Sequence, residues 1–113
     1  MITIYHNPRC SKSRECLQLL QLEGISFTTV KYLAEPLGRE ELAGLIRKLG
    51  IEPMALVRQK ETVWAENYAG KLLSNEQVID ALAAHPLLIE RPIVVNGNKA
   101  VIARPAEKIH EIL

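Results

Sequence analysis

The N-terminal part of the chain alternates between a short β-prone run, a helical run and a second β-prone run. Residues 2–5 (ITIY) favour a strand, which a following Asn-Pro turn signal stops. Residues 12–23 (KSRECLQLLQLE) place apolar side chains at helical spacing and end at Gly24, and residues 26–33 (SFTTVKYL) favour a second strand. This order predicts a β-α-β unit with parallel strands and a right-handed crossover.

The remainder of the chain predicts a block of helices followed by a β-hairpin. Ser74 and Gln77 have the spacing of a capping box, and the Asn-Gly pair at Asn96 is a strong signal for a hairpin turn. The tract 59–73 is expected to be irregular. The expected helices cover residues 39–49, 53–58, 75–84 and 105–112, and the expected hairpin strands cover 93–95 and 100–103.

Length and composition are those of one globular domain. The chain has 113 residues, of which 48% are hydrophobic and 24% charged, so it can bury a single core. Because a parallel β-α-β unit and a hairpin can share one sheet, we predict an α/β fold with a four-stranded mixed sheet. The expected order is β-α-β, a helical insertion at about 37–84, and β-β-α, all within one domain over residues 1–113.

Charge and cysteine content argue against several function classes. The formal net charge of +1 gives no general attraction to nucleic acid or to a membrane, and no apolar run approaches the roughly 18 residues of a membrane span. The N-terminus lacks the pattern of a signal peptide. The two cysteines form neither a CxxC pair nor a metal-ligand pattern. We therefore expect a cytoplasmic monomer without a bound cofactor or metal.

Cys10 lies in HNPRCSKSR (residues 6–14), where the first strand gives way to the first helix. Unpaired backbone N–H groups and the positive end of the helix dipole favour the thiolate there, and the thiolate is the nucleophilic form of cysteine. A free cysteine packed as a small apolar side chain is the alternative. The polar side chains that can add positive charge or donate a hydrogen bond to the sulfur favour the reactive thiolate: His6, Arg9, Ser11, Lys12, Ser13 and Arg14.

The second cysteine, Cys16, has a different pattern around it. It follows Cys10 by six residues, about 600° further round a helix at roughly 100° per residue, and should point away from it. It shares an apolar stripe with Leu19 and Leu20. We therefore expect Cys16 in the core, where free cysteines are common.

Three arginines stand out by their context: Arg58, Arg91 and Arg104. Arg91 and Arg104 flank the expected hairpin at its outer ends, and these ends are neighbours in an antiparallel pair. Their guanidinium groups could converge on one oxyanion and bind it bidentately. The alternative is that each arginine is a solvated surface charge.

These residues resemble the glutaredoxin-coupled arsenate reductase family, and in particular its short bacterial relatives with an NPRCSKSR motif. The matching pieces follow one another in family order and cover nearly the whole chain. They are IYHNPRCSKSR at 4–14, YLAEP at 32–36, the LxxLIRKLGI block at 42–51, ALVRQK at 55–60, HPLLIERPIVV at 85–95 and ARPAEKIHEIL at 103–113.

The resemblance implies a thioredoxin-like fold and a role for each matching site residue. Cys10 matches the nucleophile, and Pro92 matches the proline that thioredoxin-like proteins hold in the cis form beside the active-site cysteine. The three arginines named above match those that hold the arsenic oxyanion. The positions that support the thiolate match His6, Ser13 and Arg14.

The resemblance also implies a reaction: the Cys10 thiolate attacks arsenate, glutathione acts as co-substrate, and glutaredoxin removes the glutathione left on Cys10. Two alternatives stay open. One is a general glutathione-dependent thiol oxidoreductase of the same fold. The other is a non-enzymatic regulator that binds RNA polymerase, although Ser13 stands where the CxxC switch of such regulators has its second cysteine.

Overall fold

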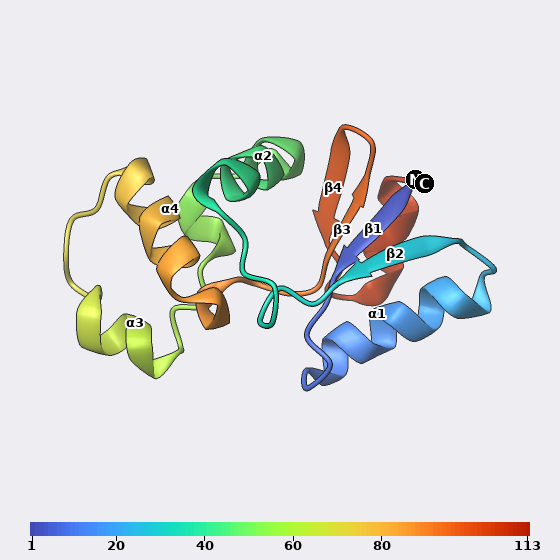
Figure 1. Cartoon of the computed structure of the whole chain (residues 1–113), viewed down its shortest axis with the longest axis horizontal. Coiled ribbons are helices and arrows are strands. Elements are labelled where there is room, and N and C mark those ends of the chain that lie inside the picture. Colours follow the sequence, from blue (N-terminus) through green and yellow to red (C-terminus); the bar gives the residue numbers. More distant parts are fainter. The chain divides into compact units, whose positions relative to one another are not determined.

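The computed structural model describes residues 1–113 and contains one four-stranded sheet (Figure 1). Its strands are β1 (Ile2–Tyr5), β2 (Phe27–Val30), β3 (Ile93–Asn96) and β4 (Lys99–Ile102), in the order β2-β1-β3-β4. β1 is parallel to β2 and antiparallel to β3, and β3 is antiparallel to β4. The predicted four-stranded mixed sheet is confirmed.

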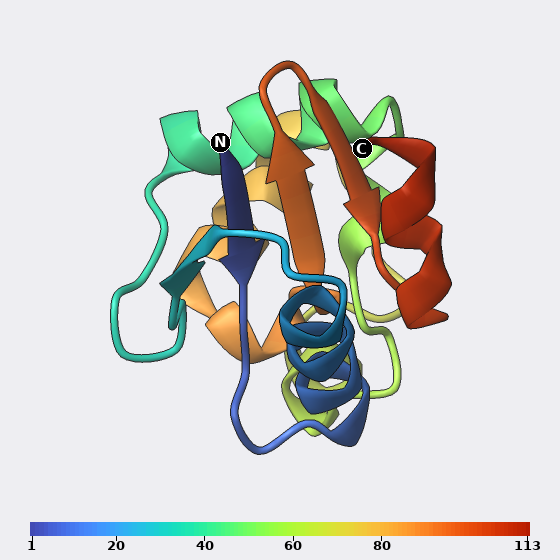
Figure 2. The ribbon, with the colours of Figure 1, turned by 90° about the vertical axis from the view of Figure 1, so that its right-hand side faces the viewer.

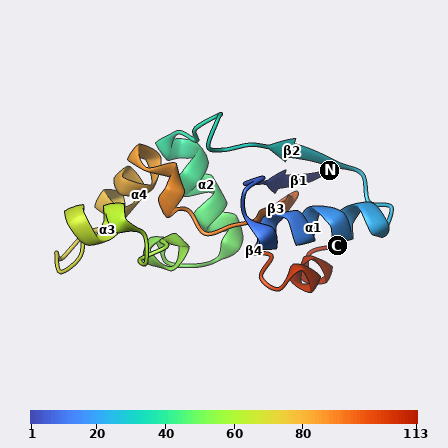
Figure 3. The same ribbon diagram turned by 90° about the horizontal axis from the view of Figure 1, so that it is seen from below.

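The chain forms two compact units, one of Met1–Glu35 with Arg91–Leu113 and one of Pro36–Glu90. The sequence analysis placed the helical insertion at about 37–84. The first unit holds the sheet, the helix α1 (Ser11–Leu22) and the 3-10 helix η3 (Ala106–Glu111). Both helices pack on the same face of the sheet (Figures 2 and 3).

The core of the first unit lies between this sheet face and the two helices. Alternate strand residues supply it because successive side chains of a strand point to opposite faces. The buried residues of this core are Ile2, Ile4, Cys16, Leu20, Val94, Val101, Ala103, Ala106, Ile109 and Ile112. α1 is thereby fixed along the sheet, with its N-terminus next to the carboxyl end of β1.

The hairpin turn between β3 and β4 consists of Gly97 and Asn98. Gly97 has a positive φ of 61°, whereas Asn98 does not have a positive φ. A positive φ at the first central position alone is the pattern of a type II′ turn, which suits a two-residue hairpin. The turn sets the β3–β4 register and so brings Arg91 and Arg104 to the same end of the hairpin.

The second unit is made of helices (Figure 1). They are α2 (Arg39–Leu49), the 3-10 helix η1 (Pro53–Leu56), α3 (Thr62–Asn67), α4 (Asn75–Ala84) and the 3-10 helix η2 (Pro86–Leu88). A single β-bridge between Val57 and Ile89 ties the two ends of the segment that carries α3 and α4. This unit positions Arg58.

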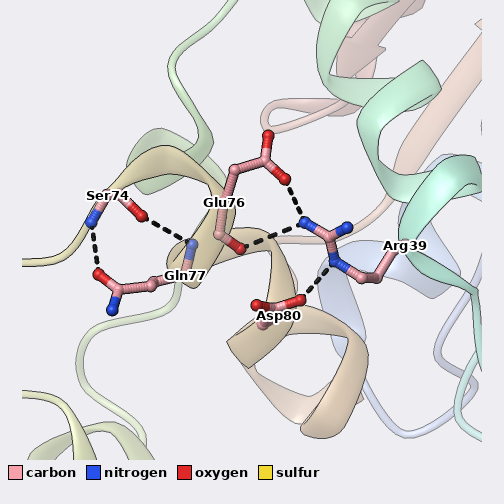
Figure 4. Close-up of polar contacts among 5 residues, drawn as sticks. All are labelled: Arg39, Ser74, Glu76, Gln77 and Asp80. Carbon is pink, nitrogen blue, oxygen red and sulfur yellow. Dashed lines mark hydrogen bonds and ion pairs between the residues drawn. The ribbon is translucent and has the colours of Figure 1, made fainter.

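Polar contacts fix the N-terminal ends of α2 and α4 (Figure 4). The Ser74 hydroxyl accepts from the Gln77 N–H at 3.2 Å, and the Gln77 side chain accepts from the Ser74 N–H at 2.8 Å. The predicted capping box is confirmed. Arg39 of α2 forms ion pairs with Glu76 and Asp80 of α4. Both raise the pKa of Arg39, and the hydrogen bond to Glu76 has the largest effect.

Several predicted elements differ from the structure. The expected helices 53–58 and 105–112 are the shorter 3-10 helices η1 and η3. The tract 59–73 is not irregular throughout, because it contains α3. Trp64 is buried and stacks on Tyr68 with ring centroids 5.1 Å apart, so packing stabilises a helix too short to show a periodic sequence pattern. The expected strand 26–33 shortens to Phe27–Val30, since β1 offers only four partners and a turn begins at Lys31. None of the helices has the length and apolar character needed to cross a membrane.

Candidate active site

Cys10 is the N-cap residue of α1. Its backbone is extended, with φ −93° and ψ 122°, and its carbonyl accepts the first helical hydrogen bond from the Arg14 N–H at 3.0 Å. An N-cap side chain faces the free N–H groups of the first helical turn. Cys10 therefore stands at the N-terminal end of α1, although its side chain makes no capping hydrogen bond.

The surroundings of the sulfur lower the pKa of Cys10 below its ordinary value of 9.0. Partial burial works in the opposite direction and raises the pKa. It is outweighed by the nearby Ser13 N–H, Arg91 side chain and Lys12 N–H, which favour the charged sulfur, and by the charge of Arg91. Hydrogen bonds and positive charge stabilise the thiolate more than the thiol, so Cys10 is the activated cysteine of this chain.

Arg91 and Arg104 lie together beside Cys10. Arg91 donates to the sulfur, and the Arg104 guanidinium Nη1 lies 3.4 Å from the Arg91 carbonyl oxygen. Two further donors of Arg91, Nε and Nη1, are buried and have no hydrogen-bond partner. The Arg91–Pro92 peptide bond is cis, and so is the Arg104–Pro105 bond. This corner of the first unit thus combines a cysteine of lowered pKa with two guanidinium groups.

His6 and Ser13 form a buried pair below the Cys10 loop. His6 Nδ1 lies 2.6 Å from the Ser13 hydroxyl oxygen, which also accepts from the Asn7 N–H at 3.0 Å. Burial lowers the pKa of His6, and the charges of Lys31 and Arg14 lower it further, so the neutral ring is favoured. The sequence suggested a hydrogen bond from His6 to the Cys10 sulfur. In the structure the His6 side chain bonds to Ser13 instead.

Arg14 and Lys12 reach away from the sulfur. The Arg14 Nη1 donates to the Pro8 carbonyl oxygen at 2.9 Å and so braces the loop in front of α1. The Lys12 side chain is exposed and lies 3.7 Å from Glu15. Lys12 lowers the pKa of Cys10 through its backbone N–H and not through its side-chain charge.

Arg58 lies in the second unit. Its backbone N–H donates to the Leu88 carbonyl oxygen at 2.7 Å, and its Nη2 is 3.9 Å from a Glu61 carboxylate oxygen. Its Nε is buried without a hydrogen-bond partner. Of the site residues expected from the sequence, the first unit brings together Cys10, His6, Ser13, Arg14, Arg91, Pro92 and Arg104.

Comparisons with known proteins identify the family of the chain. The family model described as ArsC family matches residues 5–112, nearly the whole chain. The chain belongs to the ArsC family. A curated relative, the uncharacterized protein YfgD of Escherichia coli K12, is 46% identical over 99% of this chain and 96% of its own length. The arsenate reductase of Neisseria meningitidis serogroup A is 42% identical over 99% of this chain and 97% of its own length.

Solved structures of ArsC relatives have the same fold. The arsenate reductase from Vibrio cholerae superposes with a TM-score of 0.95 at 46% identity, covering 99% of this chain and 97% of the other. The thioredoxin-like α/β fold predicted from the sequence is confirmed.

Cys16 lies in the core of this ArsC chain. Its side chain is 0% exposed, and burial raises the pKa of its thiol to about 11. Cys16 lies on the buried face of α1, as the sequence predicted. No group of three or more His, Cys, Asp or Glu side chains could hold a metal ion.

The sequence analysis did not single out Asn7 as a site residue. Asn7 is buried and makes three hydrogen bonds in the loop that leads to Cys10. The Asn-Pro turn signal identified the turn, but only the structure shows that Asn7 bonds to Arg9, Cys10 and Ser13.

Proposed function

We propose that this protein is an arsenate reductase that uses Cys10 as its nucleophile. The observation that carries the proposal is the Arg91 guanidinium, which donates to the Cys10 sulfur while two of its buried nitrogens have no partner. Buried donors that are left unpaired cost free energy, which an oxyanion accepting from them would recover. Relatives named arsenate reductase share 42% identity with the chain over almost its full length.

In the first proposed step the Cys10 thiolate attacks arsenic(V). A sulfur–arsenic bond forms, and one arsenate oxygen leaves as water after taking up two protons. Arg91 and Arg104 hold the remaining oxygens, because planar guanidinium forks match the geometry of an oxyanion. Fixed positive charge beside the developing negative charge lowers the barrier without reorganisation of solvent.

In the second proposed step the thiolate of glutathione attacks the Cys10 sulfur. A disulfide forms between Cys10 and glutathione, and the electron pair of the sulfur–arsenic bond stays on arsenic, which leaves as arsenite. Arsenic is reduced by two electrons, and the two thiols are oxidised to one disulfide. A glutaredoxin thiolate then attacks the glutathione sulfur and releases the Cys10 thiolate.

The need for an external thiol is supported by the cysteines of the chain. Ser13 stands three residues after Cys10, so no CxxC pair can form, and Cys16 is fully buried with a raised pKa. No second thiol of this chain is thus ready to resolve an adduct on Cys10. We propose glutathione as co-substrate and glutaredoxin as partner for this reason and because of the family resemblance.

Arg58 is the third proposed ligand of the oxyanion. Its assignment is supported by the family resemblance and by its buried Nε, which has no partner within the protein. Its ion pair with Glu61 is long, at 3.9 Å, and leaves the guanidinium free to bind an anion more closely.

A general glutathione-dependent thiol oxidoreductase is the second candidate. Such an enzyme also uses a single activated thiol and needs no resolving cysteine. The two candidates differ in the use they make of Arg104. An oxidoreductase acting on glutathione adducts needs the thiolate but no second guanidinium. Removal of Arg104 should therefore spare its activity and impair arsenate reduction.

The test is arsenate reduction in the presence of glutathione, glutaredoxin and a system that recycles oxidised glutathione. We expect turnover by the wild type, none by Cys10→Ser, wild-type turnover by Cys16→Val, and a strong loss for Arg104→Met. The same variants are assayed for release of glutathione from a glutathionylated peptide. Equal inactivity of the wild type and Cys10→Ser with arsenate would refute the proposal. Peptide turnover that survives in Arg104→Met would favour the second candidate.

A further inference from the structure

Asn7 makes hydrogen bonds to the loop that ends at Cys10 and to the first turn of α1. Its backbone N–H donates to the Ser13 hydroxyl oxygen, its side-chain Oδ1 accepts from the Arg9 N–H, and its carbonyl oxygen accepts from the Cys10 N–H, each at 3.0 Å. The residue is only 4% exposed. Three contacts from one buried residue therefore define the path of the chain between β1 and α1.

The bond from the Cys10 N–H closes a turn over Asn7, Pro8, Arg9 and Cys10. Arg9 does not have a positive φ, which excludes a type II turn and leaves type I. Asparagine at the first position and proline at the second are favoured in this turn type. The Oδ1 bond to the Arg9 N–H is an Asx turn that reinforces it from inside.

This turn determines where the Cys10 sulfur lies. An N-cap side chain can accept from the Lys12 and Ser13 N–H groups only while the N-cap backbone is extended and held next to the first helical turn. The turn fixes Cys10 from the N-terminal side, and the Asn7–Ser13 bond ties the same turn to the first turn of α1. A shift of the sulfur would move it relative to the Lys12 and Ser13 N–H groups and to Arg91, which together lower the pKa of Cys10.

We propose that Asn7 is a positioning residue for Cys10: its side chain and backbone hold the type I turn that places the sulfur over the N–H groups of α1. Asn7 itself touches neither the sulfur nor a substrate in this role. The inference concerns the same thiolate as the proposed function. Its test measures the titration of Cys10 and not arsenate turnover. Failure of the positioning role can therefore be distinguished from failure of the proposed function.

The test compares the pKa of Cys10 in the wild type, Asn7→Ala and Asn7→Ser. The pKa is obtained from the pH dependence of the rate of alkylation by iodoacetamide. Alanine removes the Oδ1 acceptor, so we expect the pKa to rise by about one unit, a tenfold loss of thiolate well below the pKa. Serine can replace the acceptor more weakly, so we expect a rise of about half a unit.

Two controls separate positioning from loss of stability. Val101→Ala removes buried volume from the core of the same unit, and Asn98→Ala removes an exposed asparagine from the hairpin turn. Both should keep the wild-type pKa of Cys10, although the first lowers the thermal midpoint. Arsenite or arsenate is not needed for any of these measurements.

Wild-type pKa values for Cys10 in the folded Asn7 variants would overturn the proposal, and so would a rise in Val101→Ala equal to that in Asn7→Ala. If Asn7→Ala does not fold, Asn7→Ser decides alone: a rise of about half a unit supports the proposal, and no rise contradicts it.

Discussion

Replacing Arg91 by methionine tests the physical basis of the activated thiol. Arg91 acts on the Cys10 sulfur in two ways, through a hydrogen bond and through its charge. A hydrogen bond to a charged group contributes about 1.5–3 kcal/mol, which corresponds to roughly one to two pKa units at about 1.4 kcal/mol per unit. Because Cys10 is partly exposed and water screens the interaction, the lower end applies. We expect the pKa of Cys10 to rise by about one unit in Arg91→Met.

The assay is an ultraviolet titration of the thiolate, repeated as an alkylation rate against pH. Cys16 does not interfere, since it is buried and its thiol titrates at a pKa of about 11. Arg9→Met is the matched control because it removes the same charge one residue from Cys10. The Arg9 side chain is exposed, and no hydrogen bond from it contributes to the Cys10 pKa, so its removal should shift that pKa much less. Equal shifts in both variants, or no shift in Arg91→Met, would refute the reasoning.

Two further predictions follow from the buried residues of the first unit. Cys16→Val should lower the free energy of unfolding by less than about 1.5 kcal/mol in a urea titration and leave arsenate turnover unchanged; loss of turnover would show that Cys16 takes part in the reaction. The lowered pKa of His6 means that the unfolded state binds its proton more readily than the folded state. Stability should therefore fall as the pH decreases below the ordinary histidine pKa of 6.5, and this fall should be smaller in His6→Gln. An equal fall in both proteins would contradict the assignment of a neutral, buried His6.

The local part of the site could be predicted from the sequence. A cysteine between an Asn-Pro turn and the start of an amphipathic helix indicates an N-cap position, and the structure places Cys10 there. The stripe shared by Cys16, Leu19 and Leu20 likewise indicated a cysteine that faces the core. Such features depend on residues within two helical turns, whose geometry the local sequence determines.

The parts that depend on distant segments could not be derived in this way. The hairpin pattern implied that Arg91 and Arg104 are neighbours, but only the β1–β3 pairing shows that this end of the hairpin lies next to Cys10. α3 was missed because its six residues are held by the stacking of Trp64 on Tyr68 and not by helical periodicity. The hydrogen bond of His6 goes to Ser13, a choice set by burial that the order of residues does not reveal.

The most direct test of the proposed mechanism is the mass of the intact protein after incubation with arsenate and glutathione, with glutaredoxin left out. Without glutaredoxin the cycle should stop after the second step. We expect one glutathione per protein, attached to Cys10, formed only when arsenate is present and accompanied by an equal amount of arsenite. An adduct that forms equally well without arsenate, or arsenite released without any adduct on Cys10, would contradict the mechanism.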